Sequence, residues 1–142
     1  MMGERTVLGD TGDMNSSGML WTGRVLTALF ALFILAASVA PKLAGATVVD
    51  ETLSQLGWPT HFGLMLGLIE LGCLVLYLVP RTSVLGAVLM TGFLGGAMAT
   101  QVRVGSPLFS HQLFGIYLGL FMWGGLWLRD VKLRALFPLR AP

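Results

Sequence analysis

Four long apolar stretches, almost free of charge, constrain the fold of this chain more than any other feature. A transmembrane helix needs about 20 apolar residues to cross a hydrocarbon core of about 30 Å, and each stretch can supply a helix of this kind. Glu70 is the one Asp, Glu, Lys or Arg inside them, and they cover residues 25–41, 61–80, 82–102 and 104–128. Because the connections between them are short, the sequence predicts an all-α protein, a four-transmembrane-helix antiparallel bundle.

Composition supports a membrane location. The 142 residues are 55% hydrophobic and 11% charged, whereas a soluble domain has roughly 25% charged residues. A soluble monomer of this length would bury only about two-thirds of its surface, which would leave large apolar patches in water. The net charge of +2, with no basic run, argues against nucleic acid as a partner. The single cysteine, Cys73, excludes an internal disulfide and a cysteine-rich zinc site.

The polar residues divide the chain into three parts. Residues 1–20 are rich in Gly, Ser, Thr and Asp, which predicts a flexible N-terminal tail. The transmembrane domain is expected over residues 21–138, and a short C-terminal tail over residues 139–142.

The connection between the first two stretches carries a helical pattern of its own. Thr47 and Asp50 resemble a capping box, and Val49, Leu53 and Leu56 follow helical spacing until Gly57 and Pro59. This pattern predicts a short amphipathic helix on the outer surface; a loop with accidental periodicity is the alternative.

The positions of the basic residues predict the orientation. With four spans, seven of the nine Lys and Arg residues share the side that holds both termini, and Lys42 and Arg103 are on the other side. The positive-inside rule therefore predicts cytoplasmic N- and C-termini, in a multi-pass protein of the bacterial inner (plasma) membrane. Trp21, Trp123 and Trp127 suit the inner interface.

Glycine pairs indicate how the helices associate. Membrane helices pack through small residues, and GxxxG spacings occur at Gly63 and Gly67, at 92 and 96, and at 115 and 119. Packing within the chain is the expected role, and contact with other membrane subunits or a homo-oligomer is the alternative.

Glu70 is the most informative single residue. It follows His61 by nine positions, about 13 Å along a helix axis, which places it near the middle of the bilayer. An unpaired carboxylate there costs about 2.5–3.5 kcal/mol, so we expect Glu70 to be paired, protonated or facing a wet cavity. It shares a helix face with Gly63 and Gly67, so it is expected at a helix interface.

Other polar residues fall in the same outer half of the predicted bundle, whereas the inner half has few. Together they predict a ligand-binding pocket open to the non-cytoplasmic side, formed by Lys42, His61, Glu70, Gln101, Arg103 and His111. His61, His111 and Glu70 lack the i, i+3 or i, i+4 spacing of a helical metal site, so no metal site is predicted.

Three hypotheses account for this polar cluster. In the first, Glu70 and Lys42 or Arg103 form a buried ion pair that fixes the helices. In the second, the pocket binds the polar head of a quinone, a lipid or another small amphiphile. In the third, Glu70 changes charge as a substrate moves, as in a small proton-coupled exporter.

A series of short motifs accompanies the apolar stretches. The series runs through Gly57-Trp58-Pro59, Glu70, Pro80-Arg81-Thr82, the segment TGFLGGAMAT at 91–100, Arg103-Val104-Gly105-Ser106-Pro107 with His111, and Trp127-Leu128-Arg129-Asp130. In this order the motifs resemble the DoxX-like family of membrane proteins, over residues 24–138.

The resemblance implies a four-helix membrane bundle and says less about activity. The family's namesake is the membrane subunit of an archaeal thiosulfate:quinone oxidoreductase, and other relatives are linked to redox-stress complexes or to the assembly of partner membrane proteins. The resemblance implies no catalytic residues, so whether the chain is an enzyme stays open. Lys42, Glu70, Arg103 and His111 match recurrent polar positions of the family, which implies a shared pocket. We therefore expect a small subunit of a quinone-linked membrane complex, with an assembly subunit without ligand as the alternative.

Overall fold

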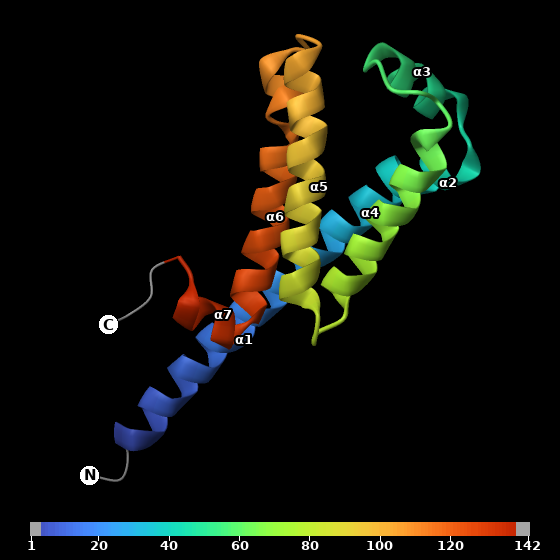
Figure 1. Cartoon of the computed structure of the whole chain (residues 1–142). Coiled ribbons are helices and arrows are strands. Elements are labelled where there is room, and N and C mark those ends of the chain that lie inside the picture. Colours follow the sequence, from blue (N-terminus) through green and yellow to red (C-terminus); the bar gives the residue numbers. More distant parts are fainter. Residues whose placement is uncertain (1–3, 139–142) are drawn as a thin grey trace.

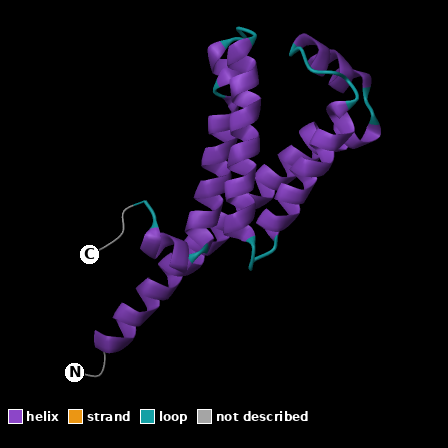
Figure 2. Ribbon diagram, in the orientation of Figure 1, coloured by secondary structure: helices purple, strands orange, loops and turns teal. Residues whose placement is uncertain are grey.

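The protein is built from helices throughout the part that the structure describes. The computed structural model describes the backbone of residues 4–138 and the side chains of residues 16–138. Figure 2 shows helices joined by short loops, with no strand in this range. The elements in chain order are α1 (Glu4–Ile34), the π-helical segment η1 (Leu35–Val39), α2 (Ala40–Ala44), α3 (Thr47–Gln55), α4 (Phe62–Leu78), α5 (Ser83–Arg103), the π-helical segment η2 (Leu108–Gln112), α6 (Phe114–Arg129) and α7 (Val131–Leu136). The all-α prediction is confirmed.

Two of the described helices are long and apolar enough to cross a membrane. One runs without interruption through α1, η1 and α2 over Ser16–Ala44, and the other is α5. α4 is apolar but has 17 residues, and α6 has 16. Four membrane spans therefore remain a prediction for the chain as a whole.

The last apolar stretch differs from the single helix that was predicted. Residues 104–128 form a turn at Gly105, the segment η2 and then α6. Gly105 has a φ of 71°, which favours glycine, and Pro107 lacks the N–H that a continuous helix would need. The separate helix α7 was also not anticipated; it begins after Asp130, whose Oδ1 accepts the backbone N–H groups of Lys132 and Leu133.

The N-terminal and connecting segments can be compared with their predictions in the same way. The segment 4–20, predicted as a flexible tail, belongs to α1 in this structure, and its mobility stays a prediction. The short helix predicted after the first span is confirmed as α3. The capping box is wrong, because Ala46 is the N-cap and no side chain caps the helix. Val49 and Leu53 face Gly63 of α4, and Gly57 ends the segment with a φ of 73°.

The helices diverge toward one end of the molecule. In Figure 1, α5 and α6 lie side by side, and α4 lies beside α2; these two pairs separate toward the end that carries α3. α1 packs on α6 near the opposite end, where the N-terminal part of α1, α7 and the α4–α5 turn are found.

The core lies where the four longest helices cross. Tyr77 is fully buried there, donates a hydrogen bond to the carbonyl of Met122 at 2.8 Å and lies edge-on to Phe30. The largest apolar side chains buried with it are Phe30, Ile34, Met90, Met122 and Leu126. Their burial joins α1, α4, α5 and α6 around one cluster.

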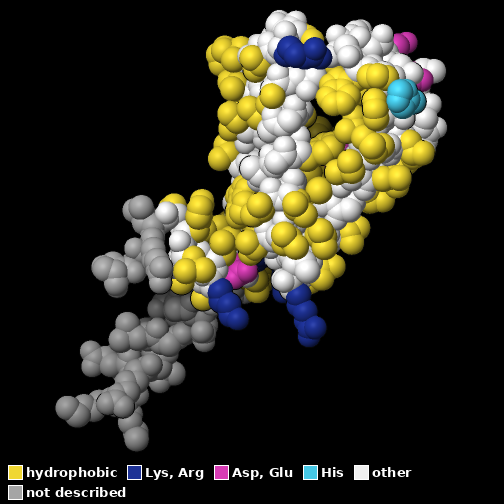
Figure 3. All heavy atoms as spheres, in the orientation of Figure 1, with side chains coloured by type: hydrophobic (Ala, Val, Ile, Leu, Met, Phe, Trp, Pro, Cys, Tyr) yellow, Lys and Arg dark blue, Asp and Glu magenta, His cyan; other side chains and the backbone are white. Residues whose placement is uncertain are grey.

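Large apolar side chains also cover the outside of the helices. Leu32 is 65% exposed and Leu120 is 67% exposed. Figure 3 shows hydrophobic side chains along one whole face, with Lys and Arg near its two ends. This distribution is that of a surface in contact with lipid rather than water.

Candidate functional site

A buried ion pair joins the first membrane helix to α4. The Nζ of Lys42 lies 2.6 Å from Oε2 of Glu70, whose side chain is 2% exposed. The hydroxyl of Ser38 donates to the same carboxylate oxygen at 2.8 Å, and it accepts a hydrogen bond from Lys42 at 2.6 Å. Of the three states expected for Glu70, the structure shows the paired one, and Lys42, not Arg103, is its partner.

The local backbone explains why this pair can form. Ser38 lies in η1 and Lys42 in α2, four positions apart, so both side chains lie on one side of the helix. Gly67 of α4 allows the two backbones to approach, because a Cβ at Gly67 would lie 2.8 Å from the Cβ of Lys42. Of the two roles considered for the Gly63 and Gly67 pair, the structure shows packing within the chain.

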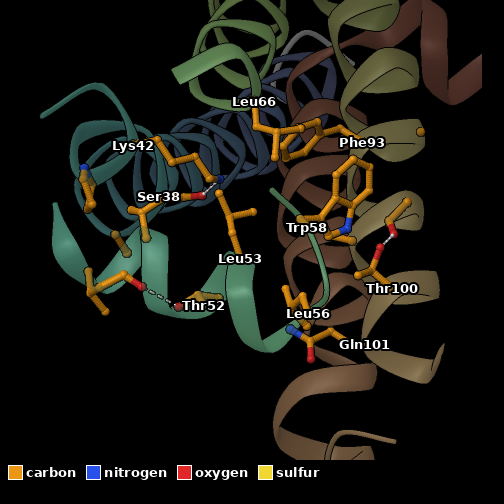
Figure 4. Close-up of a pocket in the computed structure, with 17 residues that line it drawn as sticks. Ser38, Lys42, Thr52, Leu53, Leu56, Trp58, Leu66, Phe93, Thr100 and Gln101 are labelled. Carbon is orange, nitrogen blue, oxygen red and sulfur yellow. Dashed lines mark hydrogen bonds between the residues drawn. The ribbon is translucent and has the colours of Figure 1, made fainter. Parts of the chain in front are cut away.

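A cleft of about 480 Å³ opens beside the ion pair. It is enclosed by the η1–α2 region, α3, α4, the Trp58 segment and α5 (Figure 4). Most of its lining is apolar, with Leu53, Leu66 and Phe93 prominent. The polar side chains in its wall are Ser38, Lys42, Thr52, Thr100 and Gln101.

Lys42 belongs both to the ion pair and to the wall of the cleft. Two of its three N–H donors are used by Ser38 and Glu70. The ammonium also lies 5.4 Å from the centre of the Phe93 ring, a cation–π distance. Its third donor has no hydrogen-bond acceptor among residues 16–138, so it is available to a molecule in the cleft.

The other predicted site residues do not all gather around Glu70. Gln101 lines the cleft, and its side-chain oxygen accepts the hydroxyl of Ser106. Arg103 is exposed and donates to the carbonyl of Leu56. His61 stacks beside Phe62, and His111 is hydrogen-bonded to Ser110; both are exposed and outside the lining.

Within residues 16–138, neither histidine nor Arg103 bonds the Glu70 carboxylate, and none of the three lines the cleft, so their part in a ligand site stays a prediction. His61 is the N-cap residue of α4, and His111 lies in η2, before α6 begins. Arg103 is used to connect the end of α5 to the turn after α3. Within residues 16–138, no three His, Cys, Asp or Glu side chains are close enough to hold a metal ion.

The cleft face of α5 was not anticipated. Gly92, Phe93, Gly96, Ala97 and Thr100 line the cleft at i, i+3 and i+4 spacing, which is one helix face. A Cβ at Gly92 or Gly96 would meet no atom within 4 Å. The GxxxG spacing on this helix therefore leaves room in the cleft and does not pack two helices together. The spacing in the sequence does not distinguish a glycine pair that packs helices from one that lines a cleft.

Arg103 gives a first testable prediction. Since its guanidinium holds the carbonyl of Leu56, Arg103→Gln is expected to loosen the turn between α3 and α4. Hydrogen–deuterium exchange should then be faster at residues 53–58 and unchanged at residues 70–78. Unchanged exchange at the turn would show that the arginine does not restrain it.

Comparison with known proteins adds the family of the chain. The sequence profile described as the DoxX-like family matches residues 25–125, which include Lys42, Glu70 and all the cleft residues named above. Comparisons with curated proteins and with solved structures gave no match.

Proposed function

Since the chain belongs to the DoxX-like family of membrane proteins, we propose that it binds a small amphiphile, quinone-like or lipid-like, in the cleft beside Lys42. In this proposal the protein is a small subunit that acts beside another membrane protein. The polar end of the ligand meets Lys42 and Gln101, and its apolar part contacts the leucine and phenylalanine side chains.

The cleft is the observation that carries this proposal. Ligand pockets have volumes of about 300–1,000 Å³, a mainly apolar lining and a few placed polar groups. The cleft of about 480 Å³ fits this description, with the ammonium of Lys42 at one wall. A quinone ring or one segment of a lipid fits such a volume.

The chemistry of the wall favours a ligand with oxygen acceptors. The third N–H of Lys42 is a charged donor, and hydrogen bonds to a charged donor are about twice as strong as neutral ones. The carbonyl of a quinone and the ester or phosphate oxygen of a lipid are both suitable acceptors. The carboxylate of Glu70 holds the ammonium in position and is not itself part of the lining.

A second function is supported by the same ion pair. The Oε2 of Glu70 receives hydrogen bonds from Ser38 and Lys42 of its own chain, so the group is satisfied without a ligand. In this alternative the pair only fixes the first helix against α4, and the protein is an assembly subunit. The two functions differ in whether the cleft is occupied.

Filling the cleft tests the proposal directly. Gly96→Leu places a side chain in the cleft. The matched control Gly95→Leu adds the same side chain at the preceding residue of α5, which is outside the lining. We expect Gly96→Leu to weaken quinone binding at least about fivefold, because overpacking costs about 1–3 kcal/mol.

Binding can be followed by the quenching of Trp58 fluorescence, since Trp58 lines the cleft. Decylubiquinone, a short-chain quinone, is added to the protein in nanodiscs, and Trp58→Phe identifies the quenching that comes from this residue. A lipid-like ligand is tested by displacement of the bound quinone with phosphatidylethanolamine. Equal quinone affinities for Gly96→Leu and Gly95→Leu would argue against a ligand in the cleft.

A further inference from the structure

A second cavity, of about 300 Å³, lies at the opposite end of the molecule from α3. It is formed where the α4–α5 turn meets the end of α6 and the start of α7. Pro80 and Ser83 form one side, and Leu126, Arg129, Asp130 and Lys132 form the other. None of these residues belongs to the cleft beside Lys42.

The charges in this cavity are not balanced by ion pairs. Arg129 and Lys132 are positive, and Asp130 is negative, so the lining has a net charge of +1. Within residues 16–138 the one salt bridge is that of Lys42 with Glu70, and neither cation here has a carboxylate within 4 Å. The carboxylate of Asp130 is instead engaged through Oδ1 by two backbone N–H groups of α7.

Arg129 has a buried donor without an acceptor. Its guanidinium is held over the Tyr77 ring at 5.3 Å, and one Nη2 donates to the Tyr77 carbonyl at 3.3 Å. Its Nε is buried and has no hydrogen-bond partner, the one such side-chain atom among the described residues. Buried polar groups in folded proteins are nearly always hydrogen-bonded, whereas Arg129 keeps N–H donors that no acceptor within residues 16–138 uses.

We infer that this cavity binds the phosphate of an anionic phospholipid headgroup. A guanidinium presents planar donors that suit phosphate oxygens, and an ammonium adds a point charge. The cavity lies at an end of the helices, and the predicted topology puts this end beside the lipid headgroups, where basic pockets between membrane helices bind anionic lipids. Leu126 and the exposed Val131 provide apolar contacts for the first part of the acyl chains.

The test compares retained lipid in matched variants of the full-length protein. The protein is placed in nanodiscs of phosphatidylcholine with phosphatidylglycerol. Native mass spectrometry then counts the phosphatidylglycerol molecules that stay bound after the protein is released from the nanodisc. We expect Lys132→Gln to lower its affinity about fivefold, the effect of one Lys or Arg near an anionic surface. Arg129→Lys keeps the charge but removes the planar donors, and it is also expected to lose the lipid.

Arg134→Gln is the control, because it removes a charge from the same end of the molecule outside the cavity. Lys132 is exposed, and its side chain makes no hydrogen bond or ion pair with residues 16–138, so Lys132→Gln keeps the test valid even if Arg129→Lys affects folding. If Lys132→Gln and Arg134→Gln retain phosphatidylglycerol equally, the proposal is overturned. Displacement of the lipid by inorganic phosphate at equal concentration would overturn the lipid assignment and leave a free-phosphate site.

Discussion

Replacing Glu70 with leucine is expected to lower the free energy of unfolding by about 3–5 kcal/mol, because it leaves the Lys42 ammonium without its buried partner. Lys42→Met should cost a similar amount, since it leaves a carboxylate that is 2% exposed with only the Ser38 hydroxyl. Unfolding of the protein in a mild detergent, by added sodium dodecyl sulfate, measures these changes.

The double variant Glu70→Leu with Lys42→Met is expected to be at least as stable as the wild type. Replacing both members of a buried pair by apolar residues is often neutral or stabilising, and Ser38 can then bond a carbonyl of its own helix. Glu51→Leu, at an exposed carboxylate on α3, is the matched control and should have little effect. A small loss in Glu70→Leu, equal to that in Glu51→Leu, would show that the pair does not hold the helices.

The double variant also separates the two proposed functions. It keeps the helices together without the ammonium that faces the cleft. If the protein binds an amphiphile through Lys42, this variant should fold and yet bind decylubiquinone less tightly. If the pair is only structural, folding and association with partners should both be preserved.

Gly86→Ala is expected to destabilise the protein by about 3 kcal/mol, the upper end of the usual cost of overpacking. A Cβ at Gly86 would lie 2.1 Å from the backbone nitrogen of Tyr77 and 2.5 Å from its Cα. Backbone atoms cannot rotate away as a side chain can, so α5 would have to move from α4. The same unfolding assay in detergent measures the change.

Gly95→Ala is the control for this prediction. It lies on the same helix, and a Cβ there meets no atom within 4 Å. Because alanine is a better helix former than glycine by about 0.8–1.0 kcal/mol, this variant should be as stable as the wild type or more so. A Gly86→Ala protein that unfolds like Gly95→Ala would mean that the close contact of α4 and α5 does not exist in the membrane.

The apolar helices could be predicted because a lipid environment requires them. Continuous apolar stretches must satisfy their backbone groups internally, so helices over residues 25–41, 61–80 and 82–102 were predicted and are found, whereas the extension of α1 back to Glu4 was not predicted. A lone carboxylate at mid-depth needs a partner, and Ser38 and Lys42 stand four residues apart on the neighbouring span. This reasoning left Lys42 and Arg103 as the two candidate partners, and the structure shows Lys42.

The partners at the helix ends could not be predicted in the same way. Arg103, His61 and His111 were assigned to the pocket from their place in the outer half of the predicted bundle, and Arg103 and His111 also from the family resemblance. The positions of their side chains depend on the loops at the helix ends, and these loops are held by contacts between distant segments, such as that of Arg103 with Leu56. Depth gives the level of a residue in the bilayer but not the direction in which it points.

The positions where the helices make close contact could also not be predicted from the spacing of glycines in the sequence. Gly86, which packs on the Tyr77 backbone, is not part of any GxxxG pair considered above, whereas Gly92 and Gly96 are and line a cleft. Gly23 and Gly125 bring α1 and α6 together, with a Cβ at Gly23 lying 2.8 Å from the carbonyl oxygen of Gly125. A glycine pairs with a glycine of another helix here, and only the three-dimensional crossing shows it.

The most direct test of the central claim is native mass spectrometry of the protein extracted from its own membrane in a mild detergent. An amphiphile that occupies the cleft should remain as an added mass on the wild type and on Gly95→Leu, and should be lost from Gly96→Leu. The same added mass on all three proteins, or none on any of them, would contradict a ligand in the cleft beside Lys42.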